Sequence, residues 1–183
     1  MRARVRIGLL LFGSVALMAL PGVASAHDHE LPEPVLHHGG QHQDAGFVEV
    51  QWVWATGPDT CIQGNFIGTG EFGDPPGRPL VVPFATPRAS IRIDGISHVP
   101  SQVELFSWRK LGRNGAPAGE STTHPVTVTP RVVRGEIVAL DLSFTPPKRG
   151  HAYLQLFALW PDVEGCGGEQ WGIWRFHLFA QNP

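Results

Sequence analysis

The sequence has few of the features that mark membrane, helical or nucleic-acid-binding proteins. Beyond its first 20 residues it holds no apolar run of the length, about 20 residues, that crosses a bilayer. No later segment shows a helical period with caps. Acidic residues outnumber basic ones, 16 to 14. Because nucleic acids and anionic membranes attract positive surfaces, neither is an expected partner. Because no apolar run after the first 20 residues is long enough, we also expect no transmembrane segment in the mature chain.

Catalytic signatures are missing as well. The chain contains no nucleophile elbow of the G-x-S-x-G type, no H-E-x-x-H zinc motif, no P-loop and no G-x-G-x-x-G loop that follows a strand and opens a helix. No reaction can be read from the sequence. We therefore expect a binding protein rather than an enzyme, with no assigned catalytic residue.

The N-terminus is typical of an exported protein. Three arginines within the first six residues precede an apolar run over 7–20, and Ala24-Ser25-Ala26 fits the small-x-small cleavage rule. We predict that 1–26 is a cleaved secretion signal and that the protein is secreted or periplasmic. Cleavage leaves 157 residues with 11 basic and 16 acidic side chains, enough for one good core.

Sulfur-containing residues are scarce. Cys61 and Cys166 are the only cysteines, and in an exported protein such a pair most often forms a disulfide. The bond would close a loop of roughly 100 residues, for which the chain-entropy model gives about 5 kcal/mol. Met1 and Met18 both lie in the signal, so the mature chain has no thioether ligand for Cu(I).

What the sequence does contain is alternation of apolar and polar residues with a period of two. This pattern predicts strands at 47–54, 90–96, 102–110, 122–129, 136–145, 151–160 and 171–180. Glycine- and proline-rich turns separate them. In the strand at 136–145 the pattern points Val138, Leu140, Leu142 and Phe144 inward. About seven strands with regular turns predict an all-β, antiparallel, immunoglobulin-like β-sandwich over 47–183.

One segment carries a resemblance to known domains. Leu140 to Leu156, a strand followed by PPKRG and HAYLQL, resembles the E–F corner of immunoglobulin-like and fibronectin-like domains. The resemblance implies that Tyr153 is the corner tyrosine. Cys61 and Cys166 depart from the immunoglobulin pattern, because they fall in predicted loops rather than both in strands.

The segment before the sandwich, 27–46, is predicted to be a flexible His-rich arm, since it holds prolines, a Gly39-Gly40 pair and no aromatic residue. It contains five of the nine histidines. Cleavage after Ala26 would start the chain at His27-Asp28-His29. The new α-amine, two backbone amides and the third-position imidazole then form a four-nitrogen planar set, the geometry that Cu(II) and Ni(II) favour.

A second set of imidazoles follows on the same arm. His37, His38 and His42 flank the glycine pair, which would let His42 fold back toward the other two. Neutral imidazoles are good ligands for Zn(II), Cu(II) and Ni(II). A solvated polar tail is the competing interpretation of both histidine sets.

Four residues of the domain are predicted to contact a ligand. Most tryptophans are in phase with core positions, but Trp108 and Trp171 are not, and exposed aromatic rings can stack on sugars. His151 and His177 are the histidines expected to complete a site with the arm.

Three functional hypotheses result. The first is an exported, non-enzymatic sandwich whose arm binds Cu(II), Ni(II) or Zn(II). The second is an extracellular or envelope interaction module for a glycan or a protein, with the arm a linker. In the third, a processed N-terminal His27 on a disulfide-bearing sandwich resembles lytic polysaccharide monooxygenases, which implies copper-dependent chemistry. The residues after His27 depart from that family's pattern.

Overall fold

The computed structural model describes residues 31–57, 60–68, 78–83, 86–160 and 168–181, except for the side chains of 54–57. Within these ranges the chain is all-β and antiparallel sheets dominate. They contain no helix, and so none long and apolar enough to cross a membrane. The predicted signal, 1–26, and the first residues of the predicted arm, 27–30, lie outside the described residues.

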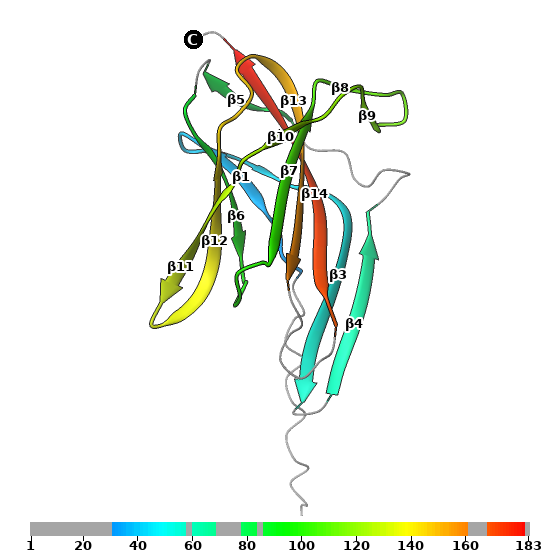
Figure 1. Cartoon of the computed structure of the whole chain (residues 1–183), viewed down its shortest axis with the longest axis vertical. Coiled ribbons are helices and arrows are strands. Elements are labelled where there is room, and N and C mark those ends of the chain that lie inside the picture. Colours follow the sequence, from blue (N-terminus) through cyan, green and yellow to red (C-terminus); the bar gives the residue numbers. More distant parts are fainter. Residues whose placement is uncertain (1–30, 58–59, 69–77, 84–85, 161–167, 182–183) are drawn as a thin grey trace, which may run out of the picture.

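Two sheets face each other across one core (Figure 1). The first sheet has five strands in the order β11, β12, β6, β1, β2. Their bounds are Thr127–Val133 for β11, Glu136–Phe144 for β12, Ala89–Asp94 for β6, Val35–His38 for β1 and Gln41–Asp44 for β2.

The second sheet has the order β10, β7, β13, β14, β3, β4, and β5 pairs in parallel with the end of β14. Its strands are β10 (Thr122–His124), β7 (Gln102–Trp108), β13 (Gly150–Trp160), β14 (Gln170–Gln181), β3 (Gly46–Gly57), β4 (Thr60–Ile67) and β5 (Leu80–Pro83). A small separate ribbon pairs β8 (Lys110–Leu111) with β9 (Pro117–Ala118).

Strict alternation in β13 and β14 builds the centre of the core. Every second residue of β13, from Ala152 to Trp160, is buried, and so are Trp174, Phe176 and Leu178 of β14. The predicted inward faces of these strands are thus confirmed. Leu140, Leu142, Ile91 and Ile93 cover them from the other sheet. A sandwich is the expected outcome, because two half-apolar sheets can bury their faces only against each other.

The predicted inward position of Val138 is wrong. This side chain is 38% exposed, whereas its neighbour Ala139 is fully buried. The register between β11 and β12 shifts at this point, from Arg131 opposite Ala139 to Val132 opposite Ile137, so no residue of β11 lies opposite Val138. A bulged residue of this kind reverses which side chains face the core, and simple alternation cannot detect it.

The predicted flexible arm is not confirmed over 35–44, where the chain instead forms a hairpin of β1 and β2. β1 pairs with β6, and Leu36 is fully buried in the core. Gly39 and Gly40 have φ angles of 55° and 83° and form the two-residue turn. Both angles are positive, as a type I′ hairpin turn requires, and glycine adopts them without strain. The glycine pair is therefore a tight turn, not a hinge.

Gln43 joins this hairpin to the second sheet. The edge of β14 is paired with β3 as far as Arg175 and with β5 from Leu178 onward. At His177, between the two, the side-chain amide of Gln43 replaces a strand. Its Oε1 accepts from the His177 N–H at 2.7 Å, and its Nε2 donates to the His177 carbonyl at 3.0 Å and to the Arg78 carbonyl.

Candidate functional site

Four rings form one group on the outer face of the second sheet, where β13 begins and β14 ends. His151 lies opposite Phe179, and Tyr153 lies opposite His177. Both opposed pairs are stacked, with ring centroids 4.4 Å apart and interplanar angles of 27° and 22°. We call these four residues the histidine–aromatic quartet. Tyr153 lies near the start of β13 and stacks on His177, and its role as a corner tyrosine stays a prediction.

The two histidines of the quartet are joined directly. His151 Nδ1 lies 2.9 Å from His177 Nε2, so one ring donates a hydrogen bond and the other accepts it. Burial lowers the pKa of His177, and the neighbouring His151 lowers it further. Both effects favour a neutral imidazole, because a desolvated cation beside another cation is unfavourable. His151 and His177 are the two domain histidines predicted to complete a site. They come together because they are diagonal neighbours on the adjacent strands β13 and β14.

A second histidine pair lies on the first sheet. His37 of β1 is directly opposite His42 of β2, and their ring centroids are 6.4 Å apart. Because side chains alternate along a strand, His37 shares the outer face with His42, whereas His38 lies on the face that carries buried Leu36. The hairpin therefore assembles two of the three predicted ligands and separates the third.

The remaining predicted metal ligands, His27, Asp28 and His29, lie outside the described residues. Among the residues that the structure does describe, no group of three or more His, Cys, Asp or Glu side chains is placed to hold a metal ion. A metal bound at either histidine pair would thus receive two protein nitrogens from the described part of the chain.

The two tryptophans selected for ligand contact are half-buried on the same outer face but far apart. Trp108 lies opposite Tyr153, in the same cross-strand row as His177. Trp171 lies opposite Leu159 and Gln51, six positions along β14 from His177, or about 20 Å. Trp108 therefore lies next to the quartet, whereas Trp171 does not.

Sequence analysis missed one half-buried histidine, His124. Its Nε2 lies 2.8 Å from Ser107 Oγ, and its ring packs edge-on against Phe144. Burial lowers the pKa of His124; a hydrogen bond with the Thr145 backbone opposes this shift, and the charge of Arg109 adds to it. Ser107 is only 6% exposed and faces the core, so this serine–histidine pair joins the strands and offers no accessible nucleophile.

Of the two cysteines in the predicted disulfide, Cys61 is the one that the structure describes. Cys61 lies on β4, opposite Ala55, and is not a free thiol. The predicted loop position of this cysteine is thus wrong. Cys166 lies outside the described residues, so its pairing with Cys61 stays a prediction.

Comparisons with family models, with curated proteins and with solved structures found no significant match for this chain. The functional argument therefore depends on the geometry of the described residues.

Proposed function

We propose that this chain is an exported, non-enzymatic β-sandwich protein that binds Cu(II), Ni(II) or Zn(II) through its N-terminal histidines. One observation carries the proposal: His37 and His42 are direct cross-strand neighbours, with ring centroids 6.4 Å apart. In a two-residue hairpin the pair next to the turn is hydrogen-bonded, and the following pair, here His37 and His42, is the closer-packed, non-hydrogen-bonded kind.

The rigidity of the hairpin favours chelation at this pair. The buried Leu36, the Gly39-Gly40 turn and the Gln43 hydrogen bonds all hold the hairpin in place. Two imidazoles on a fixed ladder lose less conformational entropy on binding a metal than two on a free arm. Imidazole nitrogens are good ligands for Cu(II), Ni(II) and Zn(II).

The predicted chelate at His27-Asp28-His29 is a separate contribution to the same function. It needs the free amine that signal cleavage would create and both backbone amides, and it does not depend on the fold. Mass spectrometry of exported protein tests this part: we expect loss of 1–26. The same spectrum tests the Cys61–Cys166 disulfide, since the oxidised chain is two hydrogens lighter than the reduced one.

Titration calorimetry with Ni(II) and Zn(II) tests the hairpin pair. We expect His37→Asn and His42→Asn each to weaken one binding event by about tenfold or more, because each removes a ligand. His98→Asn is the matched control, since His98 is an exposed histidine on the loop after β6, where its carbonyl accepts a hydrogen bond from Trp160 of the second sheet. Equal affinities for all three variants and the parent would refute the hairpin site.

The amino-terminal chelate is tested separately from the hairpin. Asp28→Pro removes an amide proton that the planar four-nitrogen set must lose, whereas Asp28→Ala retains it. We expect only the proline variant to lose the visible absorption of square-planar Cu(II). If both variants keep that absorption, the amino-terminal chelate is wrong.

The second candidate function is an interaction module that binds a glycan or a protein. It is favoured by the row of Trp108, Tyr153 and His177 on the outer sheet face, to which Phe106 adds a ring 6.3 Å from Trp108. Adjacent half-exposed rings can stack on sugars or on apolar side chains. We expect retention on a polysaccharide column to fall for Trp108→Ala and to persist for the remote Trp171→Ala. Equal retention of the two variants would exclude this face.

We also propose that the sandwich is immunoglobulin-like. The order β1, β6, β12, β11 in one sheet and β7, β13, β14 in the other corresponds to the A, B, E, D and C, F, G strands of that architecture. The hairpin of β3 and β4 would then be an addition at the edge of β14. NMR contacts between β1 and β6 and between β7 and β13 would support this order, and other strand neighbours would refute it.

A further inference from the structure

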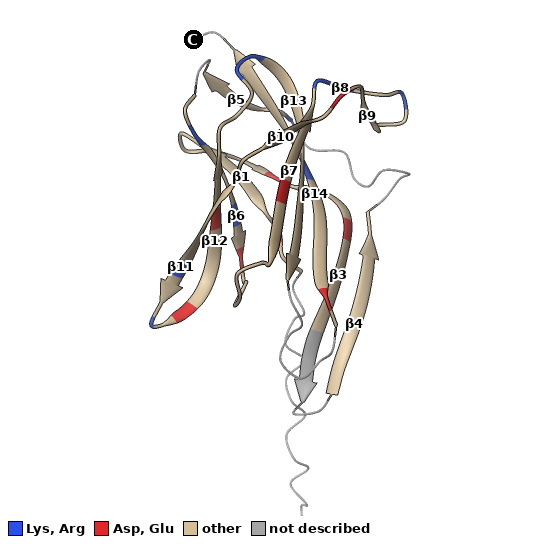
Figure 2. Cartoon of the chain, in the orientation of Figure 1, with Lys and Arg blue, Asp and Glu red and all other residues tan. Residues whose placement is uncertain are grey.

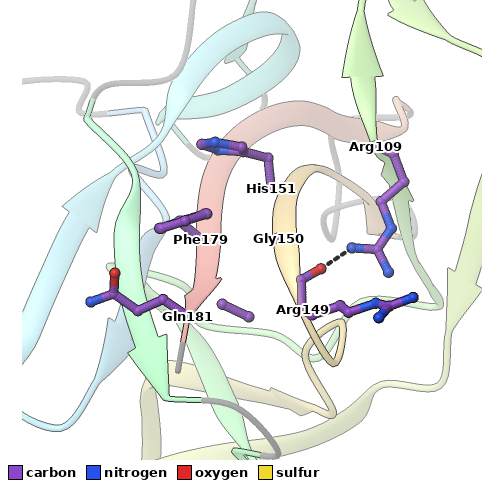
Figure 3. Close-up of a pocket in the computed structure, with 7 residues that line it drawn as sticks. Arg109, Arg149, Gly150, His151, Phe179 and Gln181 are labelled. Carbon is purple, nitrogen blue, oxygen red and sulfur yellow. Dashed lines mark hydrogen bonds between the residues drawn. The ribbon is translucent and has the colours of Figure 1, made fainter. Parts of the chain in front are cut away.

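A shallow hollow of about 560 Å³ adjoins the quartet at the end of the second sheet. Arg109 follows β7, Arg149 belongs to the turn before β13, and Gln181 ends β14. Figure 3 shows the two arginines on one side of the hollow and His151, Phe179 and Gln181 on the other. The walls are thus two cationic groups facing a ring stack and an amide.

The two arginines have no acidic partner in the described part of the chain. The single ion pair described there joins Arg92 to Asp94 on the first sheet. Arg109 donates from Nη1 to the Arg149 carbonyl, which fixes its guanidinium at the rim (Figure 3). Figure 2 shows basic residues at this turn and at the β7–β8 junction. Because neither arginine has an acidic partner among the described residues, a bound anion would supply the missing countercharge.

The opposite wall is ordered as well. His151 is stacked on Phe179 and hydrogen-bonded to His177, so its ring has a fixed orientation. A flat ring surface beside a few placed polar groups is the usual composition of a site for a small organic ligand.

We propose that this hollow binds a small organic oxyanion, with the carboxylate on Arg109 and Arg149 and the organic body against His151 and Phe179. A planar guanidinium presents paired N–H donors that match the two oxygens of a carboxylate. This site does not depend on the metal site at His37 and His42, which lies on the other sheet.

The test uses metal-free, full-length mature protein and two sugars that differ only at C6, which is a carboxylate in one and a neutral hydroxymethyl group in the other. Galacturonate and neutral galactose are each titrated into ¹⁵N-labelled protein at low salt. We expect saturable shifts of the amides of 149–151 and 179–181 with galacturonate and none with galactose. Because surface charge is screened within about 8 Å at physiological ionic strength, added salt should weaken the binding.

Variants decide whether the arginines are the ligands. We expect Arg109→Gln and Arg149→Gln each to weaken galacturonate binding at least tenfold. Arg149→Gln keeps the backbone carbonyl that Arg109 contacts, so the turn is retained. Arg131→Gln makes the same change of charge on exposed β11, outside the hollow, and should bind as the parent does. Equal binding of galactose, or equal loss in the Arg131 variant, would overturn the proposal.

Discussion

Replacing Gln43 should cost far more stability than its place in a polar, His-containing segment suggests. The side chain is 7% exposed and makes three hydrogen bonds to backbone groups of His177 and Arg78. Gln43→Leu fills a similar volume and leaves all three groups without their partner. Each unsatisfied buried group costs about 1–3 kcal/mol, and partial access of water favours the lower end, so we expect a loss of about 3–4 kcal/mol.

Urea unfolding and thermal melting measure this loss. For a domain of this size, about 2–4 °C of Tm is lost per kcal/mol, which gives a decrease of about 6–16 °C. Gln41→Leu is the matched control, because Gln41 is exposed on the same strand. A change below about 1 kcal/mol for Gln43→Leu, or equal losses for the two variants, would refute the role of this amide as a strand substitute.

The Glu variant adds a pH test of the same contact. In Gln43→Glu an oxygen replaces Nε2 and faces the carbonyl oxygens of His177 and Arg78. This contact favours the protonated carboxyl, so the pKa of the new carboxyl in the folded protein should rise above the ordinary value of about 4.3. A raised folded pKa stabilises the fold below the unfolded pKa, and this contribution is lost as pH rises through the folded pKa. Relative to the parent, this variant should therefore be least stable at neutral pH.

Two further predictions concern packing and protonation. A Cβ at Gly172 would lie 2.0 Å from the Trp174 ring, so Gly172→Ala should destabilise the fold by about 1–3 kcal/mol in urea unfolding, and adding Trp174→Leu should recover part of that loss; a neutral single variant would contradict the contact. Burial lowers the folded pKa of His124 and of His177. The contribution of these two neutral histidines to the free energy of unfolding should therefore be fully present above the unfolded pKa of about 6.5, and it should be lost as pH falls through the folded pKa values. The free energy of unfolding should change less between pH 7.5 and pH 5.5 for His124→Gln than for the exposed control Thr123→Gln. Equal changes in the two variants would show that His124 does not cause the pH dependence.

The strands that simple alternation can identify are those buried on one face. β12, β13 and β14 follow this pattern, and their alternation agrees with the buried faces except at the Val138 bulge. A bulge changes the register through the geometry of the partner strand, so it leaves no local signal in its own sequence.

The hairpin of β1 and β2 was missed for a different reason. The composition of VLHHGGQHQD is polar, and only Leu36 among its apolar residues is fully buried. A two-residue Gly-Gly connection is nonetheless a recognised hairpin signal, and it was available in the sequence. The identity of the buried polar residue, Gln43, could not be inferred, because its partners lie far away along the chain.

The candidate sites were foreseen only in part. Individual residues such as His151, His177, His37 and His42 could be selected by type and density. Their pairing depends on the cross-strand register, which the turn and the buried face set together. The hollow beside Arg109 and Arg149 was not foreseen, since these arginines belong to two connections that are distant in sequence.

The central claim is that the rigid hairpin presents His37 and His42 as a metal-binding pair. Paramagnetic broadening of the ¹⁵N–¹H NMR spectrum by Cu(II) tests it most directly, in the Asp28→Pro protein, where the planar four-nitrogen set cannot form. We predict that at substoichiometric Cu(II) the signals of His37, His42 and the opposed Ser90 broaden first. Broadening that begins elsewhere, or that is uniform along the chain, would contradict the claim.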